Sequence, residues 1–407
     1  MNFNLKSPRK LCRKNLSKIR KIIAQKILFP FLKFRVRRIL KKSKTRVFAI
    51  TGSVGKTTAK NAAAEVLKSA GVEFSPRSFN TPFGIFFTIF GIEKAPRSFF
   101  EIINFVRQIF APRKLPPNLI LEFGADRPGD LKTLLQIVKP DFAALTTIVA
   151  AHLGKKNFQN EAEIFREKVQ LLQNAKRRAL CNFKVFEKFS DENHAPKFSF
   201  FGENEKCDFC VSNLKNERDG FSFVLEIEKS RQNFFIPILG KFHFTAILPA
   251  IFFGVCAGIS LPKIAAILRN FRAGAGRGAI FKIGKLQVCD QSFNASFAAM
   301  RANLEIFAKF SAPRKIAILG EMREVGGFSE KFHREIAAIA TTNFDFVFLV
   351  GEDFRKFANH ENARFFETLQ SLENFLKNFL RAADFIFIKG SHSNNLEKVV
   401  EFLRREF

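Results

Sequence analysis

Residues 46–61 read RVFAITGSVGKTTAKN, an apolar run followed by a glycine-containing loop and the beginning of a helix. A strand, a glycine turn and a helix N-terminus in this order can bind phosphate, because backbone N–H groups and the helix dipole then point at the anion. The usual loop, G-x-x-x-x-G-K-[ST], has a glycine five places before Gly55, where this chain has Ile50. The nearest glycine is Gly52, so the sequence predicts a shorter phosphate-binding loop; a plain glycine turn is the alternative.

Each residue of this loop has an expected role in binding a magnesium nucleotide. Lys56 is expected to reach the outer phosphates, and the hydroxyl group of Thr57 or Thr58 to hold a magnesium ion. The residues expected to surround the phosphates are Gly52, Ser53, Val54, Gly55, Lys56, Thr57 and Thr58.

The rest of the chain alternates strand-like apolar runs with helical stretches. Because charged residues in the runs lie only at or next to their ends, the runs are typical of parallel strands buried on both faces. They lie at 46–50, 118–123, 141–149, 285–290, 315–320, 344–350 and 384–390. The pattern predicts two doubly wound α/β domains, the first like a P-loop ATPase and the second Rossmann-like. We place an arm at 1–45, the first domain at 46–272 with a small antiparallel layer at 196–239, and the second at 273–407.

The charge of the chain is concentrated at its amino-terminal end. The formal net charge is +30, and residues 1–46 contain seventeen Lys and Arg with no acidic residue. Basic residues interrupt every apolar run there, so neither a membrane span nor a signal peptide is expected. The arm is expected either to lie on an anionic membrane surface or to pack on the next domain; nucleic acid is disfavoured. The uncharged stretch from Phe244 to Pro262 is expected to be a buried helix.

Cysteine and aromatic usage limit the chemistry that the chain can perform. Six scattered cysteines suit reduced thiols in a cytoplasm, and the pair Cys207 and Cys210 favours a structural role over a zinc site. The chain has 55 Phe but neither Tyr nor Trp. No aromatic hydroxyl or indole N–H group is therefore available for binding or catalysis.

Three further side chains are expected to converge on the phosphate-binding loop. Glu122 ends one apolar run and His152 follows another, and the carboxyl ends of parallel strands line the ligand crevice of an open α/β sheet. Lys168 lies on the apolar face of a helix that starts near Asn160 with a capping-box-like Glu163. A buried lysine is costly unless its charge is paired or removed, so it either reaches the surface or is neutralised, for example as a carbamate.

The motifs, taken in order, resemble those of the Mur ligase family, whose phosphate loop has the short form T-G-x-x-G-K-T-[TS]. FNTPFGIFFTI (79–89) and LEFGADRPGDL (121–131) resemble two family segments, as do AHLG (151–154) and EIFREKVQLL (163–172). Downstream, the matching segments are GRG (276–278), DQSFNASFAAM (290–300), LGEMREVG (319–326), HREIA (333–337) and KGS (389–391). The resemblance covers about residues 46–407.

The resemblance implies an ATP-dependent, amide-forming ligase of peptidoglycan precursor synthesis that works through an acyl phosphate. It is strongest to the members that add D-alanyl-D-alanine to a UDP-muramoyl-tripeptide, and it implies two Mg²⁺ ions, a monomer and a cytoplasmic location. Catalytic roles fall on Lys56, Lys168 and His152, and magnesium ligands are Thr57, Glu122, His152 and carbamylated Lys168. Nucleotide contacts extend to Arg277, Asp290 and Asn294, and substrate contacts fall on Asn80, Thr81, Asn294, Lys389 and Ser391.

The chain also departs from the family pattern. The arm stands where the family has a UDP-binding domain, so a differently linked acceptor stays open. Gln291, Phe293 and Phe297 replace Asp, Tyr and Pro, and the segment that usually holds adenine reads GKFHFTA, residues 240–246. A catalytically degenerate nucleotide-binding protein at the membrane is therefore one alternative. A ligase resembling folylpolyglutamate synthetase, which shares the loop and the modified lysine, is another, and DQSFNAS (290–296) and GEMREVG (320–326) argue against it.

Overall fold

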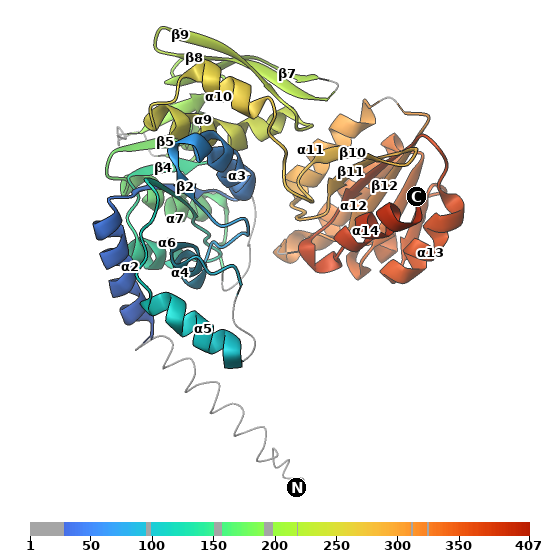
Figure 1. The fold of residues 1–407 in the computed structure, drawn as a ribbon. Helices are drawn as coiled ribbons and strands as arrows, with labels where there is room; N and C mark the ends of the chain where they lie inside the picture. The colour runs from blue at the N-terminus through green and yellow to red at the C-terminus, as the bar shows by residue number, and fades with distance from the viewer. Residues whose placement is uncertain are drawn as a thin grey trace.

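The computed structural model describes residues 28–94, 99–149, 157–190, 198–217, 219–310, 312–323 and 325–407. Within these ranges the chain forms two twisted sheets, each flanked by helices, and the two bodies lie side by side (Figure 1). The predicted class, two consecutive α/β units with largely parallel sheets, is confirmed.

The first sheet has nine strands in the order β2-β3-β1-β4-β5-β6-β7-β8-β9. The pairs from β2 to β7 are parallel, whereas β7, β8 and β9 pair antiparallel. The strands are β1 (Arg46–Thr51), β2 (Val72–Glu73), β3 (Asn118–Glu122), β4 (Phe142–Leu145), β5 (Arg178–Asn182), β6 (Ser199–Gly202), β7 (Phe209–Glu217), β8 (Gly220–Ile227) and β9 (Ser230–Ile236). The expected antiparallel strands are thus present, and they extend the parallel sheet instead of forming a separate layer.

Helices cover both faces of the first sheet, and each face has its own apolar core. The helices are α2 (Phe29–Ser43), α3 (Lys56–Leu67), α4 (Pro82–Phe90), α5 (Phe99–Phe110), α6 (Asp130–Ile137), α7 (Glu161–Gln173), α8 (Phe183–Phe189), α9 (Phe244–Cys256) and α10 (Leu261–Leu268). Short 3-10 segments lie at Lys68–Ala70 and Lys241–His243. Helix α9 contains most of the long uncharged stretch and is largely buried, as expected. In the described ranges, every helix is too short or too polar to cross a bilayer.

The second sheet has six strands in the order β10-β11-β15-β12-β13-β14, and its pairs are parallel except β10–β11. Its strands are β10 (Ala279–Ile283), β11 (Leu286–Gln291), β12 (Arg314–Gly320), β13 (Phe346–Val350), β14 (Ala363–Phe366) and β15 (Asp384–Lys389). Its helices are α11 (Phe297–Ala308), α12 (Ser329–Asn343), α13 (Leu369–Phe379) and α14 (Glu397–Glu406), with 3-10 segments at Gly326–Phe328, Glu352–Phe357 and His392–Asn394. As in the first domain, each face of the sheet has its own apolar core.

The part of the basic arm that the structure describes is helix α2. One of its faces packs on the first domain through Leu32, Val36 and Ile39, which are almost fully buried. Residues 1–27 lie outside the described ranges, so the expectation for them stays untested. For α2, packing on the next domain is confirmed, and its opposite face remains in solvent.

The strand expected at 141–149 is shorter than the apolar run, because β4 ends at Leu145. The two threonines that follow leave the sheet and contact the glycine loop. Thr146 Oγ1 donates to the carbonyl of Val54 (2.7 Å), and the carbonyl of Thr147 accepts from Ser53 N (2.8 Å). The end of this run therefore supports the loop instead of extending the ladder.

Candidate active site

The glycine loop connects β1 to α3 and has a backbone that only glycine adopts readily. Gly52 and Gly55 have φ of 147° and 84°. A Cβ atom on Gly52 would lie 2.0 Å from Thr146 Oγ1, so the loop passes too close to the segment after β4 for any side chain. Lys56 opens α3, and its ammonium group donates to the carbonyls of Gly52 (2.7 Å) and Ser53 (3.1 Å). The predicted strand–loop–helix arrangement of a phosphate cradle is present.

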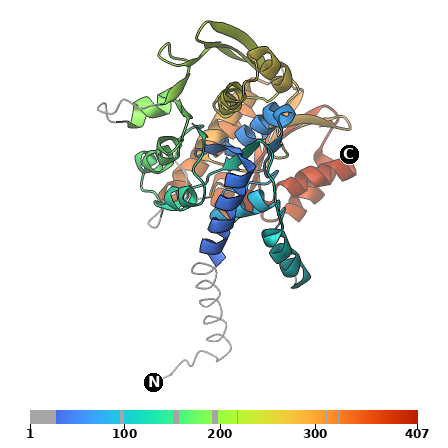
Figure 2. The same ribbon diagram turned by 60° about the vertical axis from the view of Figure 1, so that its left-hand side comes forward.

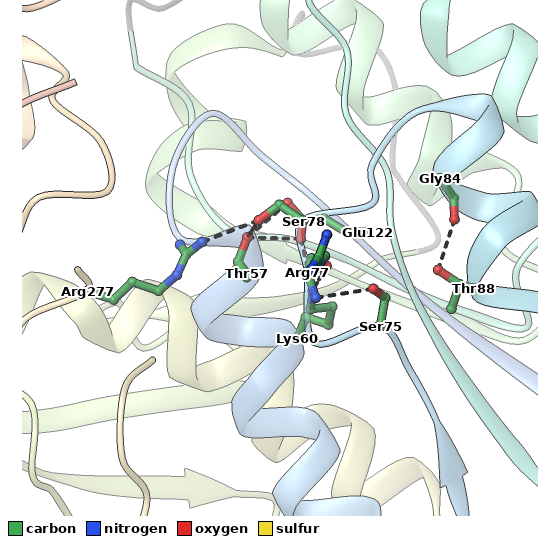
Figure 3. Close-up of polar contacts among 9 residues, drawn as sticks. All are labelled: Thr57, Lys60, Ser75, Arg77, Ser78, Gly84, Thr88, Glu122 and Arg277. Atoms are coloured by element: carbon green, nitrogen blue, oxygen red, sulfur yellow. Dashed lines mark hydrogen bonds and ion pairs between the residues drawn. The ribbon is translucent and has the colours of Figure 1, made fainter. Parts of the chain in front are cut away.

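The carboxylate of Glu122 lies directly beside the start of α3. Thr57 Oγ1 lies 3.1 and 2.9 Å from the two oxygens of Glu122 and 2.8 Å from Ser78 Oγ (Figure 3). Thr57 and Glu122 are both almost fully buried. Three oxygen-bearing side chains from different parts of the first domain therefore meet at one point.

Lys60 lies one helical turn after Lys56 and forms a buried ion pair with Glu122. Its Nζ lies 3.6 Å from Glu122 Oε2 and donates to the carbonyl of Arg77 at 2.5 Å (Figure 3). Burial lowers the pKa of Lys60, while Glu122 acts in the opposite direction. Lys60 and Glu122 therefore compensate each other's charge in a place away from water.

Arg277 reaches this cluster from the linker between the two sheets. Its guanidinium group donates to Ser78 Oγ at 3.3 Å (Figure 3). It also lies 3.7 Å from the centroid of the Phe293 ring. Asp290 shapes the turn that carries Arg277, because its Oδ2 accepts from Gly276 N at 2.9 Å. Its Oδ1 accepts from the backbone N–H and hydroxyl of Ser292 (3.1 and 2.7 Å). In this structure Asp290 therefore positions Arg277, and a direct nucleotide contact stays a prediction.

Lys168 is buried in the first domain and not at the surface. The side chain is 1 % exposed, and its ammonium group donates to the carbonyl of Ala125 at 3.1 Å. The alternative that it reaches solvent is therefore wrong. Burial, together with the charge of Lys56, lowers the pKa of Lys168 to about 7. The helix begins as predicted, since Asn160 Oδ1 accepts from Glu163 N (3.0 Å).

A second buried lysine, Lys389, lies at the end of β15 in the other domain. It donates to Gln291 Oε1 (3.2 Å) and to the carbonyl of Asn294 (2.9 Å), and Gln291 Nε2 donates to Asn303 Oδ1 (2.6 Å). Burial lowers the pKa of Lys389 to about 8. The amide of Gln291 thus occupies the place of a carboxylate while still accepting a hydrogen bond from the lysine.

The remaining predicted site residues differ in whether the structure brings them to the site. Asn80 lines a cavity between the two domains, which is described below, and its carbonyl accepts from Gly124 N (2.9 Å). Thr81 instead caps α4, with its Oγ1 accepting from Gly84 N (3.2 Å), and Ser391 Oγ accepts from Arg323 N (3.0 Å). His152 falls within residues 150–156, which lie outside the described ranges. The binding roles of Thr81, Ser391 and His152 stay predictions.

The two domains enclose a cavity of about 1000 Å³ between them. The glycine loop, Glu122, Arg277 and Lys389 line it, and so does His243 of the altered adenine segment. Burial and then the charge of Lys389 lower the pKa of His243 to about 3, so its imidazole is neutral. Its Nε2 is buried and has no hydrogen-bond partner among the described residues. A buried unpaired ring nitrogen beside the cavity is a polar contact available to a ligand.

The donor set suits magnesium better than a softer metal. In the described ranges no three His, Cys, Asp or Glu side chains gather into a metal site. Thr57 and Glu122 offer a hydroxyl and a carboxylate 2.9 Å apart. Neighbouring oxygen ligands of an octahedral Mg²⁺ are separated by about 2.9 Å, and this ion takes few protein ligands and several water or phosphate oxygens. The two side chains therefore fit the group that the phosphate loop implies.

Sequence reasoning did not identify Lys60 or Ser78 as part of the site. Lys60 shares a helix face with Lys56, and a lysine within the alanine-rich run of α3 was a signal of a buried charge pair. Ser78 immediately precedes the 79–89 segment, but a single serine in a loop gives no signal by itself.

Family models match both halves of the chain. Residues 50–254 match the Mur ligase middle domain, and residues 276–392 match the Mur ligase, glutamate ligase domain. Among curated proteins, the chain is similar to the UDP-N-acetylmuramoyl-tripeptide--D-alanyl-D-alanine ligases of Buchnera aphidicola and Rickettsia prowazekii. Identity to the first is 25 % over 383 residues, 90 % of this chain and 78 % of that protein. Identity to the second is 26 % over 376 residues, 88 % of this chain and 78 % of that protein.

Solved structures show the same fold. The chain resembles MurF from Acinetobacter baumannii with a TM-score of 0.74 and 21 % identity, covering 93 % of this chain and 80 % of that one. It resembles the MurF ligase from Thermotoga maritima, solved in complex with ADP, with a TM-score of 0.75 and 21 % identity, covering 93 % and 84 %. Both likenesses extend across the two domains.

Proposed function

This chain belongs to the Mur ligase family, and we propose that it is an ADP-forming ligase that joins D-alanyl-D-alanine to a muramoyl-tripeptide precursor of peptidoglycan. Two observations support the proposal: the curated relatives carry this activity in their names, and they align with about nine-tenths of the chain. In structural terms, the observation that supports it is the chain of contacts from Glu122 through Thr57 and Ser78 to Arg277, because it brings oxygen-bearing and cationic side chains from both domains together beside the glycine loop.

ATP is proposed to bind with its phosphates on the glycine loop. The backbone N–H groups after Gly52 and the N-terminus of α3 face the anion, and Lys56 exchanges its two loop carbonyls for phosphate oxygens. Thr57 and Glu122 would hold one Mg²⁺, which supplies positive charge to the phosphates when bound. Glu122 then has two cationic neighbours, the metal and Lys60.

The proposed reaction proceeds in two balanced steps. A carboxylate oxygen of the acceptor attacks the γ-phosphorus, and ADP leaves with the electron pair of the broken P–O bond. The amine nitrogen of the dipeptide then attacks the acyl carbon, phosphate leaves, and the nitrogen loses one proton. Lys56 and Arg277 are placed to stabilise the negative charge on the transferred group, and enclosure between the domains limits attack by water.

Lys168 is proposed to carry a carbamate that holds a second Mg²⁺, together with His152. Its near-neutral pKa supports this, because a neutral amine nitrogen can attack CO2, forming an N–C bond and releasing one proton. The carbamate would replace a buried positive charge by a negative one close to Lys56. Burial is the main reason why the pKa of Lys168 is lowered, and the exchange would also remove the repulsion between Lys168 and Lys56 that adds to it.

We further propose a monomeric enzyme at the cytoplasmic face of the membrane. The motifs do not identify the group to which the muramoyl-tripeptide of the acceptor is attached, which is UDP or another carrier. A catalytically degenerate protein is the second candidate, since Gln291 replaces an acidic residue beside Lys389.

A phosphate-release assay tests the proposal. ATP, Mg²⁺ and D-alanyl-D-alanine are supplied with muramoyl-tripeptide acceptors that carry or lack the UDP group, and the Lys56→Ala variant serves as control. Release that needs both acceptor and dipeptide supports the ligase. Release with glutamate and folate only would assign a folylpolyglutamate-type ligase, and nucleotide binding without turnover would assign the degenerate protein.

A further inference from the structure

Helices α2 and α5 form an exposed apolar face on the first domain. Five of the eight large apolar side chains that the described ranges expose lie on them: Phe34, Phe100, Ile103, Val106 and Phe110. The two helices are held together, because the Arg35 guanidinium donates to the carbonyl of Ile109 (2.8 Å) and the Phe31 and Phe110 rings lie 5.2 Å apart. Figure 2 shows α2 on the forward side of the domain with α5 beside it.

A cationic cavity of about 1010 Å³ lies on the other flank of α2. Its walls come from α2 and from the segments at the ends of α6 and α7, at the opposite edge of the sheet from the glycine loop. Eight of its lining side chains are Lys or Arg, and Asp141 is the single acidic one. Asp141 is already engaged, since it accepts from Val47 N (2.8 Å) and pairs with Lys176 (3.8 Å).

Several of these cations lack a carboxylate partner in the part of the chain that the structure describes. They are Lys41 and Lys44 of α2 and its C-cap, Lys132 of α6 and Lys139 after it. Basic residues are favourable near helix C-termini, but three helix ends contribute only about −1.5 charges. Against a net of seven positive charges, most of the cavity's charge is therefore uncompensated. The cavity is suited to a ligand that carries several phosphate or other anionic groups.

We propose that α2, α5 and the cationic cavity form one docking surface for an anionic lipid bilayer. Phe34 and the apolar side chains of α5 would enter the boundary of the acyl chains, and lipid phosphates would occupy the cavity. A soluble phosphate or a nucleic acid would use the cations but leave the apolar side chains without a partner. Residues 1–27, which precede α2, add nine Lys and Arg with no acidic residue. The sequence before this surface is therefore also positively charged. The inference rests on the proposed ligase only for its location, at the membrane where the precursor is used.

Vesicle binding by the full chain tests the surface. The wild type and a Lys41→Gln/Lys132→Gln/Lys139→Gln variant are sedimented with phosphatidylcholine vesicles containing about 30 % phosphatidylglycerol, and with neutral vesicles. Each basic side chain near such a membrane is worth about a fivefold change in binding, so the triple variant is expected to bind about a hundredfold more weakly. Lys263→Gln/Lys285→Gln/Lys331→Gln removes the same charge from other surfaces and serves as the matched control.

The apolar half of the surface needs its own variant. Phe34→Ser is expected to weaken binding to the anionic vesicles several-fold, while Phe328→Ser, at another exposed phenylalanine in the second domain, leaves it unchanged. Equal binding by the two triple variants, or no effect of Phe34→Ser, would overturn the proposal. So would tighter binding to a short DNA duplex than to vesicles at the same salt concentration.

The vesicle result can be separated from the ligase proposal. None of these substitutions lies near the catalytic cavity, so phosphate release without vesicles should be unchanged in every variant. Normal release with unaltered vesicle binding rejects the docking surface alone. Altered vesicle binding without any ligase activity in the wild type rejects the ligase alone.

Discussion

Replacing Lys60 by methionine tests whether Glu122 is a magnesium ligand. The two side chains are almost fully buried, and Lys60 Nζ lies 3.6 Å from Glu122 Oε2. At an effective dielectric constant of about 20, that pair is worth about 4–5 kcal/mol of Coulomb energy. Removing one partner of a buried pair costs about 3–5 kcal/mol, and we expect the lower end because the Thr57 hydroxyl still contacts Glu122.

Thermal denaturation without and with Mg²⁺ and ADP measures the effect. The free Lys60→Met protein should lose about 3 kcal/mol, which lowers Tm by roughly 10 °C in a domain of this size. With saturating Mg²⁺ and ADP, the metal takes over the compensation of Glu122, and binding to the folded state alone stabilises it. The difference in Tm from the wild type should then shrink to less than half.

Two controls make the comparison specific. Lys68→Met removes an exposed lysine that pairs with Glu65 just after α3, and it should change stability by no more than about 0.5 kcal/mol. ADP with a chelator should leave the Tm difference of Lys60→Met unchanged. A difference that is equally large with Mg²⁺ and ADP would refute the assignment of Glu122, and no destabilisation of the free variant would refute the ion-pair argument.

Three further predictions concern the loop and Lys168. Lys56→Ala should reduce ATP turnover at least a hundredfold with the fold retained, measured by phosphate release and circular dichroism; unchanged turnover would exclude the phosphate loop. Gly52→Ala should abolish ADP binding in calorimetry, because its Cβ would lie 2.0 Å from Thr146 Oγ1, and wild-type affinity would contradict that geometry. Lys168→Ala should lose activity that short carboxylates partly restore, and intact mass should show a CO2 adduct on the wild type only. Since the pKa of Lys168 is lowered to about 7, the adduct should increase as pH rises through 7, and an adduct that decreases would contradict the assignment.

Most of the fold was predictable because parallel strands buried on both faces appear as unbroken apolar runs. The runs at 46–50, 118–123 and 384–390 became β1, β3 and β15 almost without change. The run at 141–149 predicted too long a strand. Thr146 and Thr147 are uncharged, β-branched residues that are common in strands, but here they bind the glycine loop. Apolar periodicity cannot distinguish a ladder residue from one that supports a neighbouring loop.

The site residues that were predictable are those that lie at the end of a predicted strand or the start of a predicted helix. Lys56, Thr57 and Glu122 follow from the ends of strands and the start of a helix; Thr57 and Glu122 are in contact, and Lys56 lines the same cavity. Lys60 was missed because its partner is distant in sequence. Thr81 caps α4 in the structure and its substrate role stays a prediction, because an N-cap hydroxyl and a binding hydroxyl look alike in sequence.

The fate of the acceptor's carboxylate oxygen is the most direct test of the proposed function. A muramoyl-tripeptide acceptor whose terminal carboxylate carries heavy oxygen is incubated with ATP, Mg²⁺ and D-alanyl-D-alanine, and the released phosphate is analysed by mass spectrometry. Attack of the carboxylate on ATP followed by displacement by the amine predicts one heavy oxygen in each phosphate released. Phosphate that carries only ordinary oxygen would show that water attacks ATP, and the account of this chain as a ligase would be wrong.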